Sequence, residues 1–186
     1  MHGRRDRRGG PGLKAHRPFT AATQVGTAAH HAFELASGVG LVFQPELGLP
    51  GALAMWSTLL PLGFVTAVRS EDRLEPLLAY SRGAAVGGAA VHFILWPWRA
   101  RPIPLLDEAE GLNERQLPWY NAVLYAWGAA ATAALVRETP RRSWKWAGLG
   151  LATTVLFRKS AEYHFRWATE QAQSNPQWWN RGLRTP

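Results

Sequence analysis

The sequence predicts an all-α fold, a polytopic helical membrane bundle with four or five transmembrane helices. The mean hydropathy of −0.18 over 186 residues is unremarkable for a soluble protein, but the charged residues are segregated. Between the charged stretches lie apolar runs close to the roughly 20 residues that cross a hydrocarbon core as a helix. These runs are residues 20–43, 47–68, 77–98 and 117–136. A soluble domain of this size has little room for so many fully buried helices.

The basic residues predict how the bundle is oriented. Residues 1–19 are rich in Arg, Gly and Pro and lack periodicity, which is typical of a disordered basic arm on an anionic membrane face. Placing this arm in the cytoplasm satisfies the positive-inside rule with either four or five spans. We therefore expect a multi-pass protein of the cell membrane with a cytoplasmic N-terminus. The net charge of +8 then reflects topology and lipid headgroups, and no nucleic acid is expected as a partner.

The first two predicted spans cover residues 20–43 and 51–68. A tight turn containing Gly48 and Pro50 separates them. Pro61 lies inside the second span, where it is expected to kink the helix and free a carbonyl.

The next two predicted spans cover residues 77–96 and 118–136. Gly83 and Gly87 have the small-xxx-small spacing that lets a neighbouring helix approach closely. Arg82 lies near the cytoplasmic end of its span, where its side chain is expected to snorkel.

The C-terminal region leaves the number of spans open. Residues 144–157 are short for a span, although a tilted helix with snorkelling basic residues could cross. Four spans fit the positive-inside rule better, and Trp144 and Trp146 slightly favour five. The expected organisation is a basic arm (1–19), a transmembrane helical bundle (20–160) and a polar helical extension and tail (161–186).

The first span carries a stripe of polar residues. On a helical wheel the stripe occupies an arc of about 80°. Its members are Thr23, Thr27, His30, Glu34 and Ser37. Such groups are costly against lipid, so they are expected to face other helices or a cavity. His30 and Glu34 are spaced i, i+4 and can touch, which indicates a functional site, with an interhelix clip as the structural alternative.

His30, His31 and Glu34 also resemble half of a carboxylate–histidine metal site. No second Glu-x-x-His or His-x-x-x-His follows, so neither a metal nor a cofactor is predicted. A haem held between His31 and His92 remains an alternative, which would make the chain a b-type haem-binding membrane subunit. The chain has no cysteine, which excludes disulfides and thiolate chemistry.

The order of motifs resembles the EXPERA, or emopamil-binding-like, family of membrane isomerases, with integral-membrane terpene cyclases as a functional neighbour. The resemblance covers about residues 20–136. It rests on His30-His31-Ala-Phe-Glu34, on Trp56 followed by Pro61-Leu62, and on Trp119-Tyr120-Asn121-Ala122. It implies catalytic roles for Glu34, His30 and Asn121, and substrate-binding roles for His31, Trp56, His92, Tyr125 and Trp127. The sequence departs from those isomerases in having no acid within residues 51–68.

The expected function is an intramembrane isomerase or cyclase acting on an isoprenoid or sterol-like lipid. Moving a double bond needs an acid that protonates carbon, and Glu34 would supply it with His30 returning the proton. Aromatic faces would stabilise the transient cation. The alternative is a small transporter or accessory subunit whose polar stripe lines a path or clips a partner helix. Membrane lipids are the expected partners, and homo- or hetero-oligomers remain open.

Overall fold

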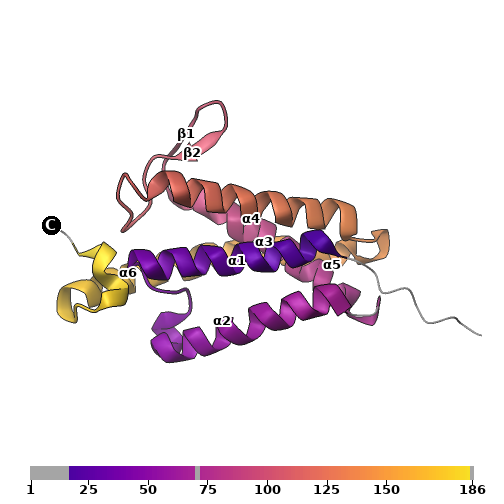
Figure 1. Ribbon diagram of the computed structural model, residues 1–186, viewed down its shortest axis with the longest axis horizontal. Helices are drawn as coiled ribbons and strands as arrows, with labels where there is room; N and C mark the ends of the chain where they lie inside the picture. Colours follow the sequence, from indigo (N-terminus) through magenta and orange to yellow (C-terminus); the bar gives the residue numbers. More distant parts are fainter. Residues whose placement is uncertain (1–16, 70–71, 185–186) are drawn as a thin grey trace, which may run out of the picture.

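The computed structural model of the protein describes residues 17–69 and 72–184 (Figure 1). Within these ranges the chain forms six α-helices and one short antiparallel hairpin. The helices are α1 (Pro18–Ser37), α2 (Gln44–Arg69), α3 (Glu75–Leu95), α4 (Leu117–Glu138), α5 (Trp144–Ala152) and α6 (Thr154–Ser174). Strands β1 (Trp98–Ala100) and β2 (Pro104–Leu106) form the hairpin, and the 3-10 helices are η1 (Asp72–Leu74), η2 (Arg141–Ser143) and η3 (Trp178–Leu183). The all-α prediction is confirmed.

The long helices run along the long axis of the molecule, and α2 stands apart from the others (Figure 1). Helix α1 packs on α4, and α3 packs on α5. The chain enters the bundle at one end, where α1 begins, and finishes at the opposite end with η3 (Figure 1). Most of the predicted arm of residues 1–19 lies outside the described residues, and Pro18 and Phe19 already belong to α1.

Both ends of α1 have clear local causes. Pro18 occupies the first turn, where its missing N–H costs nothing, and the backbone N–H groups of Phe19 and Thr20 donate to the Glu138 carboxylate at 2.8 Å. At the other end Gly38 adopts the left-handed conformation with φ of 82° and ends the helix. The first turn of α1, where the polar stripe of α1 begins, is therefore anchored to the C-terminal end of α4.

Helix α2 is one element that begins earlier than the predicted second span. The residues expected to form a turn are its first turns, and the backbone leaves helical geometry at Gly48, with φ of 66°, rather than at Pro61. Among the described helices, α2 is the one whose length and composition alone would let it cross a membrane. Only 11% of its apolar stretch is buried, which agrees with its position at the edge of the bundle, where it packs mainly on α1.

The small-residue pattern on α3 faces α5. A Cβ atom on Gly83 would collide with the backbone of Ala147, and a Cβ atom on Gly150 would collide with the backbone of Tyr80. The two backbones therefore pack in direct contact, which is the close approach that this spacing predicts.

The C-terminal helices differ from the expected boundary at residue 160. Helix α6 continues across it, separated from α5 only at Thr153. Phe165, Ala168 and Ala172 of α6 are buried in one cluster with Trp179 and Leu183 of η3. The extension is thus part of the bundle.

Polar groups lie inside this bundle and large apolar side chains lie outside. Arg82 and Thr20 are completely buried. Large exposed apolar residues include Leu62 and Phe64 of α2, Trp119 of α4 and Leu156 of α6. The interior therefore combines apolar clusters with buried charged groups, which are rare in water-soluble cores.

Candidate functional site

The polar stripe predicted on α1 faces the interior of the bundle. Four of its members, Thr23, His30, Glu34 and Ser37, are buried, and Thr20 and His31 are buried beside them. Thr23 and Thr27 each donate a hydroxyl hydrogen bond to the carbonyl four residues earlier. These threonines are satisfied within their own helix, so the remaining polar groups to explain are the histidines and Glu34.

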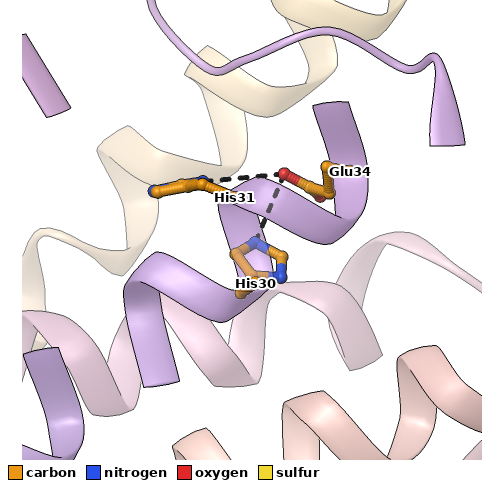
Figure 2. Close-up of side chains that lie close together, drawn as sticks. All are labelled: His30, His31 and Glu34. Carbon is orange, nitrogen blue, oxygen red and sulfur yellow. Dashed lines mark ion pairs between the residues drawn. The ribbon is translucent and has the colours of Figure 1, made fainter. Parts of the chain in front are cut away.

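Glu34 is the centre of a compact cluster (Figure 2). Its Oε2 atom lies 3.4 Å from His30 Nε2 and 3.7 Å from His31 Nδ1. Helical spacing produces both approaches, because residues three and four positions apart lie on the same face. All three residues are at most 8% exposed, so the carboxylate and both imidazoles are removed from water.

Two other helices complete the cluster around Glu34. Tyr120 of α4 donates its hydroxyl hydrogen to Glu34 Oε1 at 2.8 Å. His92 of α3 places Nε2 at 3.9 Å from the same oxygen, and its Nδ1 lies 3.3 Å from the Ala89 carbonyl. One carboxylate therefore has three imidazoles and one phenol around it, contributed by α1, α3 and α4.

Aromatic rings enclose this Glu34 cluster. The Trp127 ring stacks on His30 with centroids 4.9 Å apart and an interplanar angle of 20°. The Trp56 ring packs against His31 at 4.1 Å, and the His92 ring meets His30 edge-on at 4.7 Å. These contacts fix the imidazole planes in an apolar environment.

A cavity of about 600 Å³ lies beside the cluster, between α2 and the rest of the bundle. His30, His31, Glu34 and His92 line it, together with His164. Trp56 and Trp127 contribute aromatic faces, and leucine side chains of α2 and α3 form much of the remaining wall. A volume of this size accommodates a small organic molecule or a lipid fragment.

The C-terminal tail covers the end of α1 next to the cluster. Gly182 donates its backbone N–H to the Gly38 carbonyl at 2.9 Å, and the Arg181 guanidinium donates to the Ala36 carbonyl. His164 Nε2 lies 2.9 Å from the Val39 carbonyl in the segment that follows Glu34. Helix η3 and α6 therefore hold the loop that leaves the site.

Two residues expected in the site lie elsewhere. The Asn121 side chain accepts a hydrogen bond from the Leu106 N–H at 2.9 Å and donates to the Leu106 carbonyl at 3.1 Å, so it anchors the hairpin to α4. The Tyr125 hydroxyl donates to the Pro104 carbonyl of the same hairpin. Neither residue lines the cavity. Directly after β2, hydrogen bonding from Arg99 of β1 holds the pKa of Asp107 below its usual value.

Tyr120 was not among the site residues predicted from the sequence, where it occurred only within the Trp119-Tyr120-Asn121-Ala122 motif. The signal was nevertheless present: Tyr120, Leu124, Trp127, Ala131 and Ala134 recur at helical spacing and form the buried face of α4. Trp119 is 70% exposed and Tyr120 only 1% exposed, so the pair divides between the two faces.

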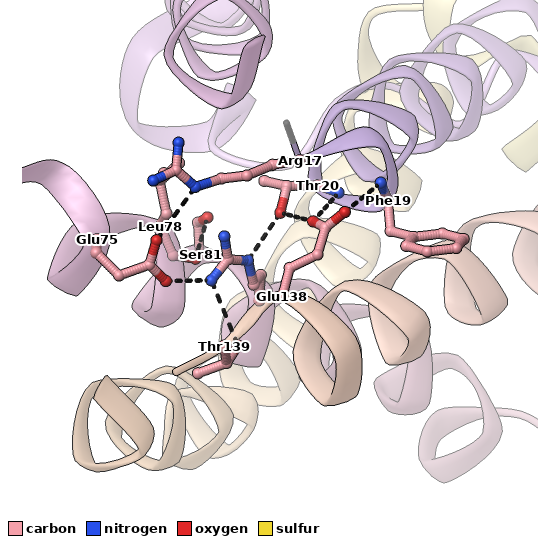
Figure 3. Close-up of polar contacts among 9 residues, drawn as sticks. Arg17, Phe19, Thr20, Glu75, Leu78, Ser81, Glu138 and Thr139 are labelled. Carbon is pink, nitrogen blue, oxygen red and sulfur yellow. Dashed lines mark hydrogen bonds and ion pairs between the residues drawn. The ribbon is translucent and has the colours of Figure 1, made fainter. Parts of the chain in front are cut away.

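A second polar cluster lies at the opposite end of the bundle (Figure 3). Arg82 forms an ion pair with Glu75 and donates from Nε to Thr20 Oγ1 at 2.7 Å, and Arg17 approaches the other Glu75 oxygen at 3.2 Å. Arg82 therefore does not snorkel. It joins α3 to the first turn of α1, which is a structural role.

Among the described residues, His30, His31 and Glu34 also form a group that could hold a metal ion, with one ligand atom from each lying within 4.8 Å of the others. No family model, curated protein or solved structure matches the chain, so the site has to be interpreted from its own geometry.

Proposed function

We propose that the protein is a multi-pass membrane enzyme that acts by proton transfer on an isoprenoid or sterol-like lipid. The observation that carries the proposal is the apolar cavity of about 600 Å³ with the Glu34 cluster in its wall. An apolar chain fits such a cavity, and ionisable groups held there act without competition from bulk water.

The distribution of side chains supports the membrane location. Exposed leucines and aromatic residues cover the outside of the bundle, where lipid would satisfy them, and the ionisable groups lie inside. Exposed Trp98, Trp119 and Trp178 occur near the site end, and exposed Trp144 and Trp146 near the other end, as expected of aromatic belts. With α5 and α6 as one crossing, the bundle has five crossings with the N-terminus in the cytoplasm.

The reaction class follows from the groups present. A protonated Glu34 adds its proton to one alkene carbon, and a neighbouring carbon loses a proton to His30, so the double bond moves with no net change in atoms. The proton then returns from His30 to Glu34 across 3.4 Å, and the pair exchanges its protons with solvent between turnovers. In a cyclisation the ring bond forms between these two proton transfers.

The surrounding residues support this chemistry in different ways. Trp56 and Trp127 line the cavity and offer ring faces to a transient carbocation. Tyr120 holds the Glu34 carboxyl in one orientation through its hydrogen bond. Asn121 and Tyr125 hold the hairpin, so the proposal gives them no contact with substrate.

The transporter alternative receives less support from the stripe itself. A proton path along α1 needs side chains that hydrogen-bond onward, whereas Thr23 and Thr27 donate back to their own helix. The haem alternative requires a porphyrin plane between His31 and His92. Both imidazoles lie within 4 Å of the Glu34 carboxylate, so Glu34 occupies the space between them that a haem would need.

The test is deuterium transfer to lipid carbon. Membranes containing the full chain are incubated in D₂O with squalene, geranylgeraniol and an unsaturated sterol, and the extracted lipids are analysed by mass spectrometry. We expect deuterium on carbon with the wild type and at least about a 100-fold lower rate with Glu34→Gln, since general acid catalysis contributes factors of that order.

Glu162→Gln is the matched control, because Glu162 is an exposed carboxylate on α6 outside the cavity. It is expected to keep the wild-type rate. The proposal fails if wild-type membranes incorporate no more deuterium than membranes without the protein, or if Glu34→Gln remains as active as Glu162→Gln.

A further inference from the structure

The spacing within the Glu34 cluster is unusual for hydrogen bonds alone. The three imidazole nitrogens lie 3.4, 3.7 and 3.9 Å from the carboxylate oxygens. These separations exceed the 2.7–3.2 Å of ordinary N–H···O bonds. They are close to the distances between neighbouring ligands of a four-coordinate ion, which are about 3.3–3.5 Å when each metal–ligand bond is about 2.1 Å.

The hydrogen bond of His92 fixes how its ring faces Glu34. A backbone carbonyl only accepts hydrogen bonds, so the nitrogen 3.3 Å from the Ala89 carbonyl, Nδ1, must carry hydrogen. In a neutral ring Nε2 then presents its lone pair toward a carboxyl oxygen, which is repulsive unless a proton or a cation lies between them. Such a hydrogen bond from the outer ring nitrogen is the usual support of a metal-bound histidine.

His31 has an unsatisfied ring nitrogen. Its Nδ1 is buried and has no hydrogen-bond partner, although it faces Glu34 Oε2 at 3.7 Å. A buried polar atom left unpaired costs about 1–3 kcal/mol, so native structures rarely retain one without a partner. A cation between His31 and Glu34 would satisfy both atoms at once.

We propose that His30, His31 and Glu34, with His92 as a fourth ligand, bind a divalent transition-metal ion in the wall of the cavity. The ligand atoms of the first three residues already lie within 4.8 Å of one another, so small side-chain rotations bring them onto one ion. Three neutral imidazoles and one carboxylate suit Zn²⁺ or Fe²⁺ and are a poor set for Mg²⁺ or Ca²⁺, which prefer oxygen.

This inference deepens the proposed function because it concerns the same cluster. With the ion bound, Glu34 and the imidazoles would serve as ligands, and a water added as a fifth ligand would be made more acidic by the charge of the ion. That water would donate the proton to substrate in place of Glu34, and the resulting hydroxide would take the proton lost by the neighbouring carbon in place of His30.

The experiment measures metal binding directly. The full chain, carrying a tag without histidine and the substitutions His2→Ala and His16→Ala, is purified in detergent and its metals are quantified by plasma mass spectrometry. It is then stripped with chelator and titrated with Zn²⁺ and with Co²⁺, whose visible spectrum reports an inner coordination shell. We expect about one equivalent per chain and a rise in Tm on adding Zn²⁺.

Substitutions in the same background identify the ligands. Glu34→Gln, His31→Asn and His92→Asn are each expected to weaken Zn²⁺ binding more than tenfold and to remove the Tm rise. His164→Gln is the matched control, since His164 lines the same cavity but lies outside the cluster. It should bind Zn²⁺ like the parent. Only variants that stay monodisperse on size exclusion are compared. If none of them does, the Co²⁺ spectrum of the parent protein still decides whether protein ligands coordinate the ion directly.

The inference is overturned if the parent protein binds no stoichiometric Zn²⁺ or Co²⁺, or if His164→Gln loses binding as much as the cluster variants. Failure of the two proposals is distinguishable. If the parent protein transfers deuterium, Glu34→Gln loses that transfer and the parent binds no metal, the proposed function stands and the ion is rejected. If the parent protein binds metal but transfers no deuterium, the ion stands and the proposed reaction is rejected.

Discussion

At the scale of single residues, the Glu34 cluster depends on one phenolic hydrogen bond between helices. Tyr120 reaches Glu34 from α4 at 2.8 Å, whereas its neighbour Trp119 faces outward. The pair therefore offers two adjacent substitutions with opposite expectations.

Tyr120→Phe removes the hydroxyl and retains the ring. Because the lost bond is made to a buried ionisable group, we expect unfolding free energy to fall by about 1.5–3 kcal/mol and the rate of deuterium transfer to fall about tenfold or more. Trp119→Phe should change neither quantity. Both are measured by denaturant unfolding in detergent and by the lipid assay, and equal effects from the two substitutions would contradict this role of Tyr120.

Arg82 provides a second test at this scale. Arg82→Met leaves Glu75 with the Arg17 contact alone in a buried position, and breaking a buried ion pair costs about 3–5 kcal/mol. Arg158→Met removes an exposed pair with Glu162 and should cost less than about 0.5 kcal/mol.

The double variant Arg82→Met/Glu75→Gln is expected to recover part of the loss, because it removes the unpaired charge as well. Thermal unfolding of the four proteins gives the coupling energy. Additive effects of Arg82→Met and Glu75→Gln would contradict a direct pair.

At the scale of elements, the contact between α3 and α5 depends on glycine. Gly150→Ala places a methyl group against the backbone of Tyr80 and is expected to destabilise the protein by about 1–3 kcal/mol. Gly148→Ala, on the outward face of the same helix, meets nothing within 4 Å and should be neutral or slightly stabilising. Chemical denaturation of both variants measures the difference, and equal destabilisation would exclude close packing as its cause.

Elements with strong periodicity were predictable from sequence, and contacts between elements were not. The helical wheel of residues 20–43 predicted that the face of α1 with His30 and Glu34 is buried, because this pattern depends on the sequence of that helix alone. That Tyr120, rather than Asn121, meets Glu34 depends on how α4 rotates against α1, which no local pattern specifies. The polar α6 suggested a separate extension because its apolar positions are few, yet Phe165, Ala168 and Ala172 pack against Val39 as well as against Trp179 and Leu183 of the tail.

At the scale of the whole molecule, the arrangement of the helices predicts on which side of a membrane each terminus lies. The described chain begins at one end of the bundle and finishes at the other (Figure 1). If α5 and α6 form one crossing, the two termini lie on opposite sides of the membrane.

A reporter fused after Pro186 tests this topology. We expect alkaline phosphatase, which is active outside the cytoplasm, to be active there, and green fluorescent protein, which fluoresces inside it, to be dark. The same reporters fused after Arg141, in the connection between α4 and α5, should give the reverse result. A fluorescent C-terminal fusion would place both ends in the cytoplasm and contradict five crossings.

The docking of η3 onto the end of α1 has a consequence for biosynthesis. Arg181 and Gly182, which cover the loop beyond Glu34, follow helices α1 to α6 in the sequence and are therefore synthesised after them. In the five-crossing topology they must also be translocated before they reach the Ala36 and Gly38 carbonyls. The newly made bundle therefore passes through a stage in which the end of α1 beside Glu34 is not yet covered, and an ion that enters the proposed site from that end would have to arrive before the tail docks.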